Sequence, residues 1–226
     1  MNKKNFIKIF KVAILVAGII FIWNAAPHSM VWAGFKAKFV DATQGLDIKE
    51  GDFIFQNIHG KLFRVIQDVT GSPLTHCGII IKKRNQWYVI EGIGPVKLTP
   101  LNEWVHRGIG REVVIVRLKE EYQKHIPEII KASYQYLDRP YDIQYEWDDE
   151  KIYCSELIYK SVKKATGIKL AEFRKLGDMN WKPHEAFIRV LAGGELPLNR
   201  KMITPGDLLE AREVEIVYNN YSGGKK

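Results

Sequence analysis

Cysteine is scarce in this sequence of 226 residues, which contains only Cys77 and Cys154. No paired-cysteine motif and no His-Glu-x-x-His motif is present, and the six histidines are scattered along the chain. These absences exclude the common zinc-site patterns, so we expect neither a metal nor another cofactor. A disulfide between the two cysteines stays open as an alternative, although a domain of about 190 residues does not need one for stability.

Acidic residues are missing from the N-terminal part of the chain, where the first is Asp41. Four lysines come before an apolar run from Val12 to Trp23, and a small-residue site, Val31-Trp32-Ala33, follows. This order is typical of a secretory signal. A helix over the apolar run rises about 18 Å, too short for a hydrocarbon core of about 30 Å. Residues 1–33 are therefore predicted to be a signal peptide or, if uncleaved, an N-terminal membrane anchor, with residues 34–226 as one domain outside the cytoplasm. That domain is expected to be periplasmic or extracellular, or held at the inner membrane.

Internal repeats and low-complexity tracts are also lacking, which argues against solenoid and disordered proteins. The formal net charge is +8, but the four leader lysines leave only +4 on residues 34–226. We see no basic stripe with interleaved aromatic residues, so no nucleic-acid partner is expected. A mildly basic surface is compatible with anionic lipid or cell-wall polymer.

Strand and helix patterns follow each other without a linker that would divide the domain. The runs at 53–56, 76–81, 86–91 and 113–116 predict strands, and those at 76–81 and 86–91 flank a polar turn as in a hairpin. Residues 62–69 fit either a strand or a short helix. Apolar residues at helical spacing predict helices over 126–137 and 154–165, with Gly167 placed to end the second. The pattern favours an α+β fold with an antiparallel sheet packed against helices.

Cys154 is the first candidate for chemistry, because it stands at the predicted start of a helix. Unpaired N–H groups at a helix N-terminus favour a thiolate, which is the reactive form of cysteine. A buried, inert cysteine is the ordinary alternative.

His76 is the second candidate, because it begins a predicted strand after a Gly-Ser-Pro-Leu-Thr loop. The ordinary alternative is a polar residue at a strand end whose hydrogen bonds are satisfied.

The hairpin brings Glu91 close to His76. A turn centred on Lys83-Arg84 places the two residues opposite each other, and a turn centred on Arg84-Asn85 makes them diagonal neighbours. Both registers leave them on one sheet face, where a carboxylate could orient the imidazole. An exposed glutamate is the alternative. Cys77 points to the opposite face by strand parity, so we expect it to pack rather than to react.

Tyr141 lies in the segment Arg139-Pro140-Tyr141-Asp142. Its hydroxyl could donate to an oxyanion during acyl transfer. From the residues alone, a Pro-Tyr turn that packs on the core is the favoured interpretation.

Five segments together resemble a known family. They are Gly51-Asp52, Thr75-His76-Cys77-Gly78-Ile79, Glu91-Gly92, Pro140-Tyr141-Asp142 and Tyr153-Cys154-Ser155-Glu156-Leu157, in that order. The sequence resembles the circularly permuted papain-like enzymes of the YiiX/YebB type, within the NlpC/P60 superfamily, over about residues 48–209. The resemblance implies a papain-like sheet or small barrel packed against helices, with Cys154 as nucleophile, His76 as base, Glu91 as its orienting acid and Tyr141 as an oxyanion or substrate contact.

The resemblance also implies a function, that of a cysteine hydrolase or acyltransferase acting on an amide or ester bond, and the leader predicts that the enzyme is exported. The expected substrate is a cell-wall peptide or a lipid, and membrane association is an open alternative. A protein that uses the same cleft only to bind a lipid or wall fragment is the main alternative to an enzyme. Two further features resemble the family but carry no predicted catalytic role. They are the residue Asp52 and the segment Thr204-Pro205-Gly206-Asp207-Leu208.

Overall fold

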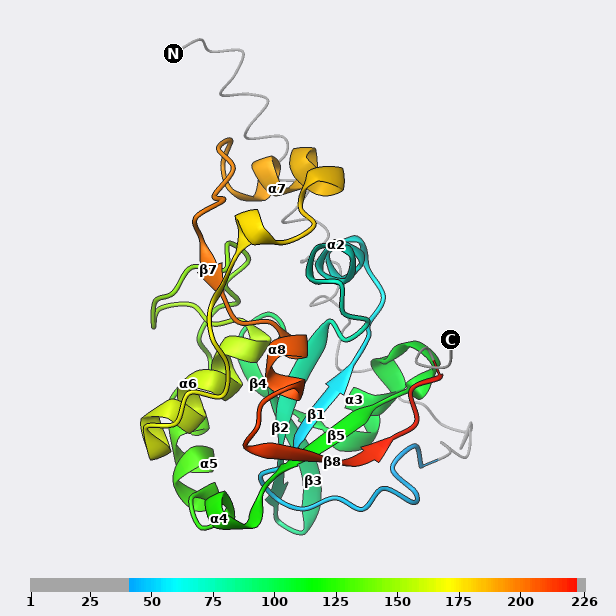
Figure 1. Cartoon of the computed structure of the whole chain (residues 1–226). Coiled ribbons are helices and arrows are strands. Elements are labelled where there is room, and N and C mark those ends of the chain that lie inside the picture. The colour runs from blue at the N-terminus through cyan, green and yellow to red at the C-terminus, as the bar shows by residue number, and fades with distance from the viewer. Residues whose placement is uncertain (1–40, 223–226) are drawn as a thin grey trace, which may run out of the picture. The chain divides into compact units, whose positions relative to one another are not determined.

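A computed structural model describes residues 41–222 and contains one antiparallel sheet with helices on both faces (Figure 1). The leader predicted over residues 1–33 lies outside the described residues. The sheet has six strands in the spatial order β4-β3-β2-β1-β5-β8. They are β1 Phe53–Gln56, β2 His76–Lys83, β3 Gln86–Gly92, β4 Val96–Pro100, β5 Val114–Leu118 and β8 Val214–Asn219. This arrangement confirms the predicted α+β class with an antiparallel sheet packed against helices.

The remaining elements are helices and one small ribbon. The helices are α2 Lys61–Thr70, α3 Leu101–Arg107, α4 Glu120–Gln123, α5 Ile126–Tyr134, α6 Cys154–Thr166, α7 Glu185–Leu191 and α8 Pro205–Leu209. The ribbon pairs β6 Arg174–Lys175 with β7 Lys201–Met202. No helix within residues 41–222 combines the length and the apolar character needed to cross a bilayer.

The hairpin β2–β3 decides between the two predicted registers. Ile79 pairs with Ile90, so the turn is centred on Arg84-Asn85. Both turn residues have positive φ, 49° and 64°, as a two-residue hairpin turn of type I′ requires. Glu91 therefore lies opposite Gly78, and His76 is its diagonal neighbour on the same face.

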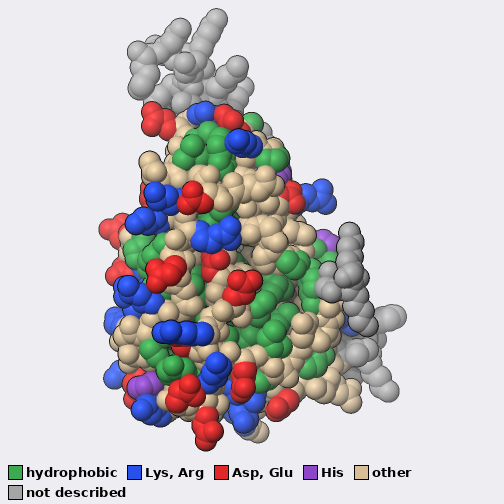
Figure 2. All heavy atoms as spheres, in the orientation of Figure 1, with side chains coloured by type: hydrophobic (Ala, Val, Ile, Leu, Met, Phe, Trp, Pro, Cys, Tyr) green, Lys and Arg blue, Asp and Glu red, His purple; other side chains and the backbone are tan. Residues whose placement is uncertain are grey.

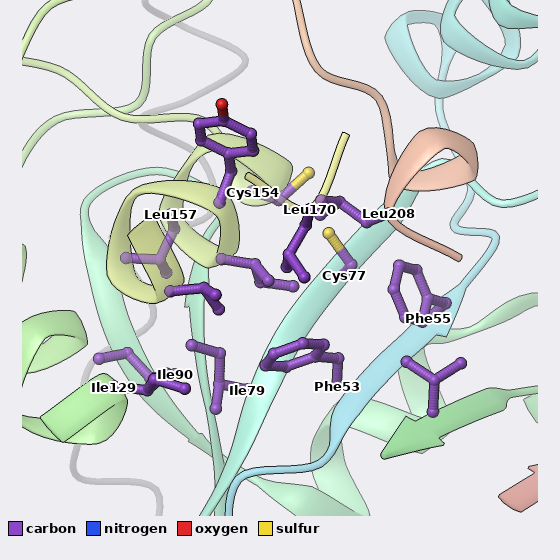
Figure 3. Packing of buried hydrophobic residues seen from close by; sticks show 14 of the residues in the cluster. Phe53, Phe55, Cys77, Ile79, Ile90, Ile129, Cys154, Leu157, Leu170 and Leu208 are labelled. Atoms are coloured by element: carbon purple, nitrogen blue, oxygen red, sulfur yellow. The ribbon is translucent and has the colours of Figure 1, made fainter. Parts of the chain in front are cut away.

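The two faces of the sheet carry separate parts of the core. Phe53, Phe55, Cys77, Ile79 and Ile90 belong to the larger cluster, which also includes residues of α5 and α6 (Figure 3). The opposite face packs against α3 and is made of Ile54, Ile80, Val89, Leu101, Trp104, Val105, Val113 and Ile115. Alternation along the strands thus assigns each residue to one helix layer.

Several elements differ from the sequence prediction or extend it. Residues 62–69 form a helix, α2, because Leu62, Val65, Ile66 and Val69 share a face at helical spacing. The strands β4 and β8 and the helix α3 have no counterpart in the predicted elements. Lysine and arginine side chains are interspersed with acidic ones over the face shown in Figure 2.

Asp52 joins two strands of the sheet through an ion pair with Arg117. Its carboxylate is buried and accepts hydrogen bonds from Arg117 Nε at 2.8 Å and Nη2 at 2.9 Å. It also accepts the N–H of Lys49 at 2.7 Å. The pair ties the entry to β1 to strand β5, which agrees with the absence of a predicted catalytic role.

Candidate active site

Cys154 is the first residue of α6 and is only 4% exposed. The preceding residue, Tyr153, has an extended backbone, and its N–H donates a hydrogen bond to the carboxylate of Glu156 at 3.2 Å. Gly92, at the end of β3, lies close to the backbone that leads into the helix, because a Cβ there would lie 3.3 Å from the Ile152 carbonyl oxygen. These local features place the thiol at a helix N-terminus, where a negative charge is favoured.

Cys77 and His76, both on β2, lie close enough to the Cys154 sulfur to shift its pKa. The pKa of Cys154 is held well below its usual value. The largest cause is a hydrogen bond from Cys77, and the next causes that lower it are a hydrogen bond from His76 and the positive charge of the imidazole. Burial opposes this shift but does not cancel it. The thiol of Cys77 has its own pKa raised well above the usual value, first by burial, so it remains protonated and can donate.

His76 links Cys154 to Glu91. The Nε2 atom of His76 lies 2.5 Å from Oε2 of Glu91, and both side chains are buried. Burial alone would lower the pKa of His76, but hydrogen bonds and negative charges at Cys154 and Glu91 outweigh it and raise the pKa to about 9. The geometry and charge favour an imidazolium between a thiolate and a carboxylate near neutral pH.

Glu91 has three further partners, which sequence reasoning missed. Thr99 donates its hydroxyl to Oε1 at 2.5 Å, Trp104 donates its indole N–H to Oε2 at 2.9 Å, and Arg107 donates from Nη2 to Oε2. Burial alone would raise the pKa of Glu91, but His76 first and then Arg107 lower it to about 2. Trp104 and Arg107 lie one turn apart on α3, and this spacing was the only signal of a shared face that the sequence offered.

Tyr141 lines a cleft that Cys154 also lines. Its hydroxyl is 3.2 Å from that of Tyr145, a residue that no motif indicated. Burial, followed by the hydroxyl of Tyr145 and the charge at Cys154, raises the pKa of Tyr141 well above its usual value. The neutral hydroxyl is therefore available as a donor to an oxygen near the sulfur.

The position of Cys77 adds a contact to the expectation from strand parity. It does point to the face opposite His76, into the larger cluster. However, α6 packs on that face, and the same cluster contains Cys154, whose sulfur lies near that of Cys77 in Figure 3. Parity thus predicted the face correctly but not the contact, because it says nothing about which helix covers the face. Both thiols are free, with no disulfide between them.

Cys154 lines an apolar cleft. The walls of this cleft come from three distant parts of the chain: α2, the loop containing Tyr141 and Tyr145, and the region from α7 to Pro205. The first wall includes Leu62 and Ile66, and the third wall includes Ile188 and Leu191. Among the described residues that line the cleft, only Arg200 has a basic or acidic side chain, and it is bound to Glu146 and to the carbonyl of Gln144.

The structure therefore brings together the four residues that the sequence singled out. Nucleophilic acyl transfer by cysteine uses three such groups: a thiol with a lowered pKa, an imidazole and a carboxylate. Thr204 and Pro205, from the late Thr-Pro-Gly-Asp-Leu segment, line the cleft beside them. Thr204 and Asp207 also cap α8 reciprocally, through bonds of 2.8 Å and 3.2 Å.

Comparison with known proteins gives three concordant results. The model of the permuted papain-like amidase family (YaeF/YiiX, C92) matches residues 47–218. The protein YiiX of Escherichia coli (strain K12) is 31% identical over an alignment of 174 residues, which covers 74% of this chain and 84% of the relative. The crystal structure of the metalloprotein yiiX from Escherichia coli O157:H7 has a TM-score of 0.74 at 27% identity, covering 78% of this chain and 99% of that one. Both the sequence and the fold thus place this chain in the permuted papain-like amidase family, whose chemistry is that of a cysteine hydrolase.

Proposed function

We propose that this protein is a cysteine acyl hydrolase or acyltransferase that cleaves an amide or ester bond of an amphiphile with a long hydrocarbon chain. The observation that carries the proposal is the apolar cleft whose lining includes the buried Cys154. Of the two substrate classes that the sequence left open, a lipid fits this cleft better than a cell-wall peptide. A peptide would bring charged groups into walls that offer them few partners, at a cost in desolvation.

The proposed reaction begins with attack of the Cys154 thiolate on the carbonyl carbon. His76, as imidazolium, gives its proton to the leaving amine or alcohol, and a thioester remains on the sulfur. Neutral His76 then removes a proton from water or another acceptor, which attacks the thioester and regenerates the thiolate. In the proposed reaction Glu91 orients the imidazole throughout, and Tyr141 donates to the oxygen that becomes negative.

The walls of the cleft provide a test of the substrate class. With the purified full-length protein and a series of acyl amides and esters, we expect kcat/KM to rise with chain length until the cleft is filled, because each buried methylene contributes about 0.8 kcal/mol. Ile66→Gln places an amide in the wall and is expected to lower kcat/KM for the longest substrate by about 10-fold or more. Turnover of a short acyl substrate should change little.

The matched control for that series is Val190→Gln on α7, where the side chain is 63% exposed and does not line the cleft. It should leave the dependence on chain length unaltered. Hydrolysis of muropeptides in preference to every lipid would contradict the lipid proposal and favour the cell-wall alternative. Binding of lipid without any turnover or thiol labelling would favour the binding protein instead.

The metal of the crystallised relative has no evident counterpart here. Within residues 41–222, no three or more histidine, cysteine, aspartate or glutamate side chains lie together in a way that could hold a metal ion. We therefore assign no step of the proposed reaction to a metal.

We also propose that the protein works outside the cytoplasm, on the basis of its N-terminal sequence. The four lysines before Val12–Trp23 and the site ending at Ala33 support export, either with cleavage or with retention as an anchor. Cell fractionation followed by intact-mass measurement is expected to find the protein in the envelope or the medium. Full-length protein free in the cytosol would contradict the proposal. An intact mass equal to that of residues 34–226 would identify cleavage after Ala33.

A further inference from the structure

Arg107 is the one additional full charge bound directly to the His76–Glu91 pair among the described residues. It belongs to α3, which packs on the sheet face that carries His76 and Glu91. Its guanidinium donates to Oε2 of Glu91, the oxygen that also contacts His76. The Arg107 side chain is only 18% exposed and Glu91 is fully buried, so water screens this contact weakly.

The charges of the site balance only when Arg107 is counted. A thiolate at Cys154, an imidazolium at His76 and a carboxylate at Glu91 leave one net negative charge in a buried site. Such a site lowers its energy by taking up a proton, and either the thiolate or the carboxylate is then lost. An arginine keeps its charge at any ordinary pH and brings the sum of the four charges to zero.

We propose that Arg107 is a positioning residue that allows Cys154 and Glu91 to be negatively charged at the same time. It acts through Glu91 and does not touch the sulfur. The four charges alternate in sign along the row, from guanidinium to carboxylate to imidazolium to thiolate. This inference rests on the proposed function for its biological meaning, but the charge balance itself does not depend on the substrate.

The other groups around the row do not replace this charge. Lys97 lies opposite Glu91 on β4, but it is exposed to solvent. On the side of Cys154, the facing groups are the thiol of Cys77 and the hydroxyls of Tyr141, Tyr145 and Tyr153. On α6 itself, the nearby carboxyl of Glu156 has its own cation, Lys160, at 2.8 Å.

The test measures how fast iodoacetamide alkylates Cys154 as a function of pH in the full-length protein, with peptide mass spectrometry to separate Cys154 from Cys77. We expect Arg107→Gln to move the midpoint of this profile upward by about one pH unit or more, because a nearby positive charge is lost. At a fixed pH below the wild-type midpoint, alkylation should slow about tenfold for every pH unit by which the midpoint rises, because the thiolate fraction falls by that factor. Arg107→Lys, which retains a charge, should lie closer to the wild type.

Two controls separate this role from a structural one. Arg111→Gln removes an exposed arginine four positions further along and should leave the midpoint in place. A purely structural Arg107 would lower the melting temperature of Arg107→Gln without moving the midpoint, and this result would overturn the inference. If the glutamine variant does not fold, Arg107→Met preserves the aliphatic stem, and the same criterion applies to it.

Alkylation needs no substrate, so the outcome is independent of the proposed reaction. A shifted midpoint in a protein that turns over no lipid or peptide would support the role of Arg107 and count against the proposed function. An unshifted midpoint in an active enzyme would do the reverse.

Discussion

Cys154→Ser is expected to abolish turnover while leaving the fold intact. A hydroxyl does not ionise at neutral pH, so the hydrogen bonds and the imidazolium that favour a thiolate at Cys154 cannot produce an alkoxide. We expect a loss of at least about 10³-fold in kcat, by analogy with other enzymes that have lost their nucleophile. Circular dichroism and the melting temperature should show a folded protein, since the change replaces one small buried side chain with another.

The same variant should also lose rapid labelling by a thiol-directed activity probe, and any label that remains should map to Cys77. Ser161→Ala provides the matched control, because Ser161 lies two turns further along α6 and its hydroxyl donates to the carbonyl of Leu157 at 2.7 Å. It should cost about 1 kcal/mol of stability without a comparable loss of rate. Turnover by Cys154→Ser close to that of the wild type would remove this residue from the mechanism.

Glu91→Gln carries the second largest expected effect, a fall in kcat on the order of 10²-fold or more. The amide retains the shape of the side chain but not the charge that holds His76 as an imidazolium. The basic limb of the pH–rate profile should therefore move to lower pH. In the wild type it reflects a pKa of His76 of about 9, because activity that needs the imidazolium is present below that pH and lost as the pH rises through it.

The structure adds a stability cost to this variant. Glutamine leaves the guanidinium of Arg107 without its counter-ion in a weakly screened position, so we expect a loss of about 1–3 kcal/mol in the free energy of unfolding. The melting temperature measures this loss separately from the rate. An unchanged rate and an unchanged basic limb in a folded Glu91→Gln protein would show that another residue orients His76.

The pH profiles of the two charge variants should differ in direction. Removing the negative charge of Glu91 lowers the pKa of His76, and removing the positive charge of Arg107 raises the pKa of Cys154. Opposite shifts are difficult to explain by a general loosening of the site, which would broaden or flatten both profiles.

Much of the site could be predicted from the sequence because its signals are local. Cys154 precedes apolar residues at helical spacing that end at Gly167, so its place at a helix N-terminus follows from a short segment. His76 and Glu91 lie on two strands joined by a polar turn, and period-two alternation put them on one face in either register. The choice between the registers depended on which two residues adopt positive φ, and the turn sequence did not decide it.

Tertiary structure alone decided what surrounds these residues. Arg107 and Trp104 reach Glu91 because α3 covers one face of the sheet, and Cys77 reaches Cys154 because α6 covers the other. The apolar cleft combines segments more than 100 residues apart in the chain, from Leu62 to Pro205. Periodicity within a segment determines which of its faces is buried, but the partner of that face is set by long-range packing, which no local pattern records.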